Sequence, residues 1–183
     1  LPRPDTPFAR TLFYFPGSTI GNFDPADAQA FLARLADLSG PGGGLLIGVD
    51  LEKDVAVLER AYDDPEGVTA AFNRNLLTRL QNELGAELDP MAFIHRASYD
   101  PDLGCIEMHL VSLRQQTIRV QDREIPFAPG QSLRTERSYK YTLAGFEALA
   151  RDAGWSVEAV WTDPDQWFSV QLLRAQAVAP DTP

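Results

Sequence analysis

The segment GSTIGN at residues 17–22 groups side chains that could hold a small polar ligand. Gly17 and Gly21 would let the backbone approach a ligand closely, and Asn22 offers both a hydrogen-bond donor and an acceptor. Its place, after a predicted strand and before a predicted helix, would suit an anionic group such as a carboxylate. An ordinary turn into a helix, with Asn22 bonding its own loop, accounts for the same residues equally well. The segment has neither the Rossmann glycine pattern nor the P-loop lysine.

Glu136 and Ser138 form a second candidate, because they lie two residues apart in a segment with the pattern of a strand. Side chains at this spacing face the same side of a strand. A carboxylate only accepts hydrogen bonds, whereas a hydroxyl both donates and accepts. Such a pair could hold the two nitrogens of an imidazole, one protonated and one not. An exposed strand whose Glu136 pairs with a neighbouring arginine is the simpler explanation of these residues alone.

Other reactive residue types are scattered. Tyr62 lies at a predicted helix end, where its phenol could reach a bound carboxylate or could simply pack. Asp50 follows a predicted buried strand and is either an acid at the sheet edge or the cap of the next helix. His95 and His109 show no metal-ligand spacing and no partner nucleophile, so we interpret them as structural. Cys105 has no recognisable activating environment, and one cysteine supplies too few thiolates for a metal site, so we expect no metal.

The elements that position these residues follow from apolar periodicity. Residues 11–15 form an almost wholly apolar run, which is typical of a buried strand. Asp24 and Pro25 then mark a helix start as N-cap and first helical residue. Residues 45–50 form a second buried strand. This order predicts a βαβ unit of a parallel sheet, in which ligands bind beyond the carboxyl ends of the strands.

The middle of the chain has a different texture, with two helices followed by alternating strand patterns, before a helix and two strands close the sequence. The expected elements are helices at 54–61, 68–84 and 143–153, strands between about 93 and 141, and an antiparallel pair at 157–162 and 168–173. The fold class is therefore α/β with a mixed insert. By analogy, such an insert often carries substrate specificity.

Composition limits the function classes. The chain has 183 residues, 44% of them hydrophobic, which suffices for a core. We interpret Trp155, Trp161 and Trp167 as core or domain-contact aromatics. The formal net charge of −10 disfavours nucleic acid or an anionic membrane surface as the partner. We expect no internal disulfide, no signal peptide, no membrane span and a cytoplasmic setting.

Several long motifs, in order, resemble one family: the histidine-specific, S-adenosylmethionine-dependent N-methyltransferases that make trimethylhistidine (hercynine) on the way to ergothioneine. The resemblance extends from Thr11 to about Leu173. The motifs are FPGSTIGNF at 15–23, LIGVDLEKD at 46–54, AYDD at 61–64 with GVTAAFN at 67–73, and TE at 135–136 with SYKY at 138–141. It implies an enzyme that transfers methyl groups from S-adenosylmethionine to the α-amino group of a small-molecule substrate, L-histidine and its methylated forms.

The resemblance also implies a fold, the C-terminal part of a class I (Rossmann-like) methyltransferase sheet with an inserted α+β substrate-binding domain. The methyltransferase domain would comprise residues 1–52 and 140–183, and the insert residues 53–139. Family members carry further sheet strands upstream, with a glycine-rich cofactor loop that this sequence lacks. Because the chain starts with Leu1, in a loop-like stretch, we expect a C-terminal portion that is inactive alone, and we assign no cofactor-binding residue.

The resemblance implies residue roles as well. Asn22 and Tyr62 would hold the histidine carboxylate, and Gly17 would line the amino-group side. Glu136 and Ser138 would grip the imidazole, in agreement with the strand pattern. No side chain is assigned a catalytic role, because the protein would chiefly orient an unprotonated amine against the methyl sulfonium. Other amino acids would be rejected because they leave the imidazole contacts unpaired.

Two alternatives stay open. A chain that keeps an amino-acid pocket without the cofactor half would be a non-catalytic binding module. A related N-methyltransferase could act instead on another aromatic amine, such as one derived from tryptophan. An aromatic pocket in place of Glu136 and Ser138 would favour that second alternative, so their presence favours histidine.

Overall fold

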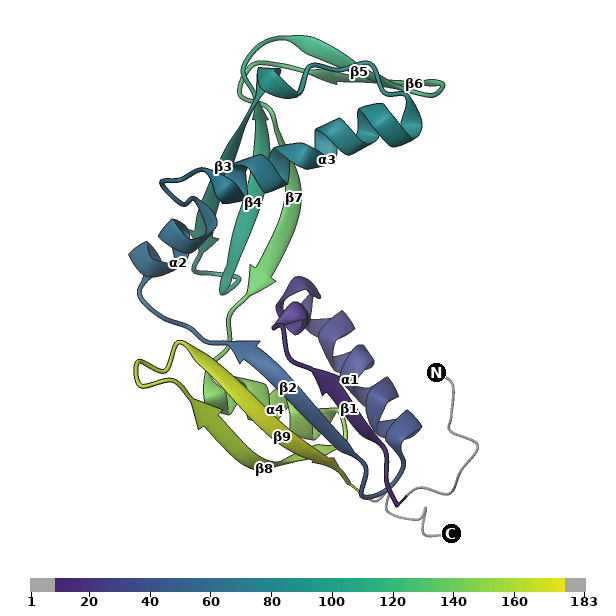
Figure 1. Cartoon of the computed structure of the whole chain (residues 1–183), viewed down its shortest axis with the longest axis vertical. Coiled ribbons are helices and arrows are strands. Elements are labelled where there is room, and N and C mark those ends of the chain that lie inside the picture. The colour runs from purple at the N-terminus through teal and green to yellow at the C-terminus, as the bar shows by residue number, and fades with distance from the viewer. Residues whose placement is uncertain (1–8, 177–183) are drawn as a thin grey trace. The chain divides into compact units, whose positions relative to one another are not determined.

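The computed structural model describes residues 9–176, and these divide into two units (Figure 1). Unit 1 comprises the described residues up to Glu52 and from Tyr139 onward, and unit 2 comprises Lys53–Ser138. The loop-like stretch at the start of the sequence lies outside the described residues.

Unit 1 is built on a four-stranded mixed sheet with the strand order β1-β2-β9-β8. Strands β1 and β2 are parallel, whereas β9 is antiparallel to both of its neighbours. Helix α1 connects β1 to β2, so the predicted βαβ unit and the α/β fold class are confirmed. The elements are β1 (Leu12–Phe15), α1 (Pro25–Ser39), β2 (Gly44–Asp50), α4 (Leu143–Asp152), β8 (Trp155–Thr162) and β9 (Phe168–Ala175).

The core of unit 1 lies between one face of this sheet and the helices α1 and α4. Leu32 from α1, Ile47 from β2, Phe146 from α4 and Trp155 from β8 are all fully buried in one apolar cluster. The indole Nε1 of Trp155 donates to the carbonyl of Leu32 at 2.9 Å, which satisfies its buried N–H. Burial of these large side chains fixes α1 and α4 on the sheet and thereby the loops at the strand ends.

The opposite face of the sheet is more exposed than the sequence suggested. Leu12 is 54% and Tyr14 71% exposed, although the apolar run around them predicted a buried strand. That prediction was wrong because β1 is an edge strand with only one face against the core cluster. Trp155 is a core residue as predicted, whereas Trp161 and Trp167 are about half exposed and do not belong to the core.

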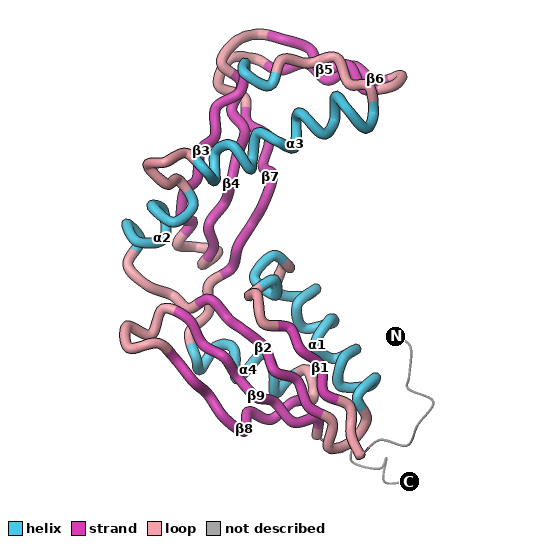
Figure 2. Tube along the Cα trace, in the orientation of Figure 1, coloured by secondary structure: helices cyan, strands magenta, loops and turns pink. Residues whose placement is uncertain are grey.

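Unit 2 combines a three-stranded sheet, with the order β3-β4-β7, a two-stranded hairpin and two helices (Figure 2). The helices at 54–61 and 68–84 and the change to strands after them are confirmed. The elements are α2 (Val55–Tyr62), α3 (Val68–Leu84), β3 (Phe93–Asp100), β4 (Cys105–Ser112), β5 (Gln116–Val120), β6 (Arg123–Phe127) and β7 (Ser132–Tyr139).

Two apolar clusters hold the helices of unit 2 on the sheet. Leu58 of α2 packs with Ile106 and Met108 of β4, and Leu77 of α3 packs with Phe93 of β3 in a second cluster. These contacts place α2 and the middle of α3 against the strands.

Candidate functional site

The loop after β1 is anchored by its own hydrogen bonds. Ser18 adopts a left-handed conformation (φ 53°), and its hydroxyl accepts from the backbone N–H of Asp50 at 2.8 Å. The N–H of Gly21 donates to the Ser18 carbonyl at 2.9 Å. Gly17 and Asn22, the predicted ligand contacts in this loop, are both exposed. The loop is therefore tied to the end of β2 while both predicted residues stay accessible to a ligand.

Gly48 of β2 is a positioning residue for this loop that the sequence analysis missed. A Cβ atom at Gly48 would lie 1.9 Å from the carbonyl oxygen of Pro16 and 2.7 Å from the ring of Phe168. Only glycine permits so close an approach of the loop to the strand. An isolated glycine inside a strand pattern was the available signal, since it often marks a close backbone approach.

Asp50, at the end of β2, is neither a helix cap nor an unpaired acid. The N-cap of α2 is Asp54, whose carboxylate accepts from the N–H groups of Ala56 and Val57. The buried Lys140 donates from Nζ to Asp50 Oδ2 at 2.7 Å. A buried ammonium group is costly without a partner of opposite charge, and Asp50 supplies one. The ion pair also joins the end of β2 to the residue that follows β7.

Tyr62 and Ser138 are brought together within unit 2. The hydroxyl of Tyr62, the last residue of α2, lies 2.8 Å from the hydroxyl of the buried Ser138 on β7. The two residues are 76 positions apart. The structure thus joins a residue expected to contact a carboxylate with one expected to contact an imidazole. A hydroxyl pair of this kind can both donate to and accept from a ligand.

Glu136 lies on β7, and the two arginines on either side of it both contact Glu107. Arg134 and Arg137 donate to the same oxygen of Glu107 on β4, at 3.1 and 2.8 Å. The hydrogen bond from Arg137, first among several causes, lowers the pKa of Glu107 to about 2. Arginine side chains are long enough to reach one carboxylate from different positions of a strand, so these two contacts do not show which way Glu136 points. That Glu136 and Ser138 share a face therefore stays a prediction.

The histidines and the cysteine of unit 2 are held by neighbours in the same unit. His95 Nε2 lies 2.8 Å from the carbonyl of Tyr62, and His109 Nε2 lies 3.1 Å from Glu107 Oε2. Burial raises the pKa of the Cys105 thiol, which keeps it in the unreactive protonated form. Among residues 9–176, no three or more histidine, cysteine, aspartate or glutamate side chains form a group that could hold a metal ion.

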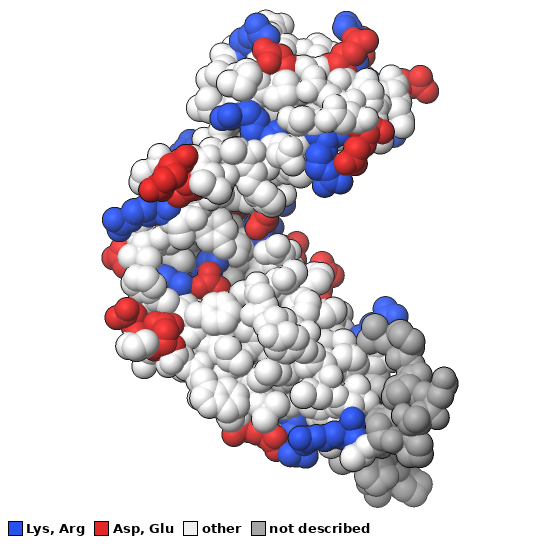
Figure 3. All heavy atoms as spheres, viewed as in Figure 1, with Lys and Arg blue, Asp and Glu red and all other residues white. Residues whose placement is uncertain are grey.

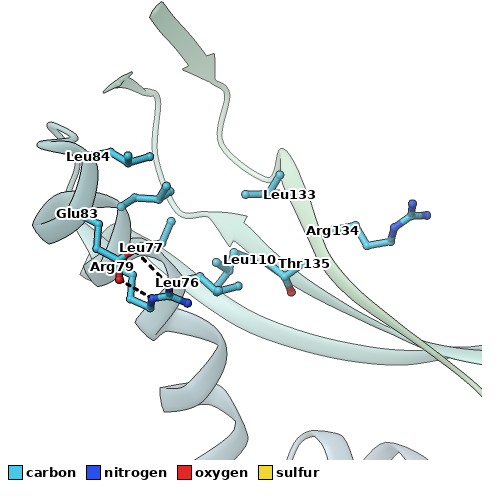
Figure 4. A pocket seen from close by; sticks show the side chains of 10 residues that line it. Leu76, Leu77, Arg79, Glu83, Leu84, Leu110, Leu133, Arg134 and Thr135 are labelled. Atoms are coloured by element: carbon cyan, nitrogen blue, oxygen red, sulfur yellow. Dashed lines mark hydrogen bonds and ion pairs between the residues drawn. The ribbon is translucent and has the colours of Figure 1, made fainter. Parts of the chain in front are cut away.

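A separate hollow of about 350 Å³ lies between α3 and the sheet of unit 2 (Figure 4). Leucine side chains such as Leu76 and Leu133 line it, and the ion pair of Arg79 with Glu83 (2.8 Å) lies at one side. None of the predicted site residues is part of its lining. The leucine lining offers few polar groups to recognise an amino acid, so this hollow does not fit the predicted ligand.

Figure 3 shows acidic and basic side chains scattered over the visible face of each unit, without a continuous basic patch. Helices within residues 9–176 are all too short or too polar to cross a membrane.

Comparison with known proteins points to one family. Residues 2–175 match the family model described as histidine-specific methyltransferase, SAM-dependent. The chain is 46% identical to a histidine N-alpha-methyltransferase of Mycolicibacterium smegmatis and 43% identical to one of Mycobacterium tuberculosis, each over 89% of this chain and 51% of the relative. It is 30% identical to ergothioneine biosynthesis protein 1 of Schizosaccharomyces pombe, over 73% of this chain and 18% of that protein. The chain thus spans about half the length of the mycobacterial relatives.

Proposed function

The chain belongs to the histidine-specific, SAM-dependent methyltransferases. From this premise we propose that it is part of an enzyme that methylates the α-amino group of L-histidine. The product would be trimethylhistidine (hercynine), a step in ergothioneine biosynthesis. The family match over residues 2–175 is the observation that carries this proposal. The pairing of Tyr62 with Ser138 supports it, because it joins residues from two of the family motifs.

Each unit has its own role in this proposal. Unit 1, residues 1–52 with the segment from about 140, is the methyltransferase domain, and unit 2 is the substrate-binding domain. In unit 2, Glu136 and Ser138 bind the two imidazole nitrogens, while the Tyr62 phenol donates to the carboxylate. In unit 1, Asn22 also binds the carboxylate and Gly17 lines the amino-group side.

These contacts account for orientation without a dedicated acid or base. Once the ring and the carboxylate are bound, the α-amine is the free group of the substrate, and its unprotonated nitrogen is the nucleophile. Holding that nitrogen in line with an electrophilic methyl group replaces an unfavourable encounter in solution. In well-oriented model reactions this lowers the activation free energy by on the order of 7–11 kcal/mol.

S-adenosylmethionine would supply the methyl group as a sulfonium. Asp50 stands at the carboxyl end of a parallel strand, and the buried Lys140 donates to its Oδ2, so this acid is already engaged by a neighbour. We assign none of the described residues to the cofactor. The roles proposed for this chain therefore concern histidine alone.

Specificity follows from contacts that only an imidazole can make. An amino acid without an imidazole would not form the ring contacts proposed for Glu136 and Ser138, so it would bind less tightly than histidine. This is the physical reason for preferring histidine over an indole amine.

A non-catalytic amino-acid-binding module is the second candidate, because the hydroxyl pair of Tyr62 and Ser138 can hold a polar ligand without any cofactor contact. We also propose a cytoplasmic setting, since the single cysteine, Cys105, is buried and unpaired.

The proposal is tested by incubating the protein, expressed from the full reading frame that contains these residues, with methyl-labelled S-adenosylmethionine and an equimolar mixture of histidine, tryptophan and phenylalanine. We expect label in histidine alone. Label in tryptophan would replace the substrate class, and label in none, with histidine binding by calorimetry, would establish the binding module.

A further inference from the structure

We infer that His95 and Asn73 are positioning residues that hold the end of α2 so that the Tyr62 phenol meets Ser138. The inference rests on the proposed function for its readout in activity, because Tyr62 and Ser138 are proposed substrate contacts. The connection itself rests on hydrogen bonds within unit 2.

The first link is between His95 and the backbone of Tyr62. Tyr62 is the last residue of α2, where helix carbonyls have no partner within the helix. Its carbonyl oxygen lies 2.8 Å from Nε2 of His95 on β3. A carbonyl only accepts, so Nε2 donates this hydrogen bond. The His95 ring thus satisfies the exposed end of α2 and joins it to the sheet.

The second link fixes the His95 ring. Nδ2 of Asn73, on α3, lies 2.9 Å from Nδ1 of His95 and donates to the carbonyl of His109 at 3.2 Å. Both amide hydrogens are used, and the flipped amide would place its oxygen against two acceptors. The amide orientation and the neutral His95 tautomer therefore determine each other.

Asn73 is not explained by its contribution to the stability of the fold. Its side chain is fully buried, and the described structure gives its amide oxygen no hydrogen-bond partner. A buried unsatisfied oxygen is destabilising, and a leucine would fill the position without it. The amide is explained by what it orients.

The segment after Tyr62 is held from the other side as well. The Asp64 carboxylate accepts from the N–H groups of Val68 and Thr69, both at 2.8 Å, at the start of α3. Tyr62 therefore lies between a backbone fixed by His95 and a corner fixed by Asp64. These contacts fix the backbone from which the phenol reaches Ser138.

The test is a double-mutant cycle in the protein from the full reading frame, with His95→Ala, Tyr62→Phe and the double variant. We expect His95→Ala to raise the KM for histidine about tenfold, with the KM for S-adenosylmethionine unchanged. If His95 acts through the Tyr62 phenol, the same change adds little in the Tyr62→Phe background. Additive effects, or an unchanged histidine KM, would overturn the inference.

Two further variants and one control keep the result interpretable if His95→Ala folds poorly. His95→Gln can still donate to the Tyr62 carbonyl and should recover most of the lost affinity for histidine. Asn73→Leu, which fills the volume without an amide, should raise the KM as His95→Ala does. His109→Ala is the matched control, because only the backbone of His109 contacts Asn73. A loss shared by His95→Gln and His109→Ala would indicate a general structural defect and contradict a positioning role.

A spectroscopic readout separates this inference from the proposed function. Ring-labelled tyrosine restricts the NMR spectrum to the tyrosine rings, and Tyr62→Phe identifies the signal concerned. We expect His95→Ala to shift the Tyr62 ring signals and His109→Ala to leave them in place, whether or not the wild type methylates histidine. A wild type without turnover would sink the proposed function, whereas an unmoved Tyr62 signal in His95→Ala would sink the positioning role.

Discussion

The hydroxyl groups of Tyr62 and Ser138 lie 2.8 Å apart, from the end of a helix and the end of a strand. The contact joins segments of unit 2 that lie 76 residues apart in the sequence. Both residues belong to motifs of the family, and the contact brings these two motifs together in the fold. A ligand that binds either hydroxyl also acts on the orientation of the other.

Removing either hydroxyl should reveal this contact as a coupling energy. We expect Tyr62→Phe and Ser138→Ala to destabilise the fold non-additively, with a coupling of about 1 kcal/mol in the free energy of unfolding. Urea unfolding of the two single variants and the double variant measures it. Purely additive losses would show that the contact does not form in solution.

A methyl group on Gly48 should displace the loop that carries Gly17 and Asn22. We expect Gly48→Ala to cost about 1–3 kcal/mol of stability, as overpacking does, and to weaken histidine binding, because its Cβ would collide with the Pro16 carbonyl. Thermal unfolding and calorimetry measure the two effects.

Gly44→Ala is the control on the same strand. Its Cβ would lie 2.8 Å from the end of the half-exposed Leu12 side chain, which can move away, and 3.6 Å from the Leu173 carbonyl, an ordinary contact distance. Equal losses in both alanine variants would contradict a specific contact between Gly48 and the loop.

Glu107 should make unfolding pH-dependent in acid. Its pKa is lowered from 4.5 to about 2 in the folded protein, chiefly by Arg137, so the carboxylate contributes stability that is complete above about pH 4.5. That contribution is lost as the pH falls from about 4.5 towards 2, when the folded state takes up the proton.

The measurement is the free energy of unfolding in urea at several pH values, for the wild type and Glu107→Gln. We expect the difference between the two proteins to be constant near neutral pH and to shrink steadily below about pH 4.5. A difference that does not change with pH would mean that the Glu107 carboxylate is not paired with the arginines.

Glu136→Ala should weaken the selection of histidine. Loss of a hydrogen bond to a charged group lowers kcat/KM for histidine by about tenfold to a hundredfold, and amino acids without an imidazole should lose little. Competition between histidine and tryptophan measures the preference. Glu83→Ala, at an exposed ion pair on α3, is the control. An unchanged preference in Glu136→Ala would refute the role of this carboxylate.

Much of the fold was predictable because its signals are local. The start of α1 at Pro25 and the end of α3 before Gly85 follow from residues that favour helix starts and ends. Even there, Asp24 occupies the N-cap position, but its carboxylate accepts from the Tyr139 hydroxyl rather than from the helix.

The rest depends on contacts between distant segments. The exposure of Tyr14 was not predictable from an apolar run, because the run does not show which face of a sheet is covered. The network of Asn73 with His95 combines a helix and a strand, and no spacing in the sequence marks it. The family motifs indicated Tyr62 and Ser138 as site residues. Only the fold of unit 2 explains why their hydroxyl groups are in contact.

The central claim is that this chain is part of a histidine α-N-methyltransferase. Product analysis tests this claim most directly. Mass spectrometry should be applied to L-histidine incubated with S-adenosylmethionine and either this 183-residue chain or the protein from the full reading frame. We predict trimethylhistidine, with all added methyl groups on the α-nitrogen, from the full protein. Histidine recovered unmodified from both, or methylated on the ring, would contradict the account.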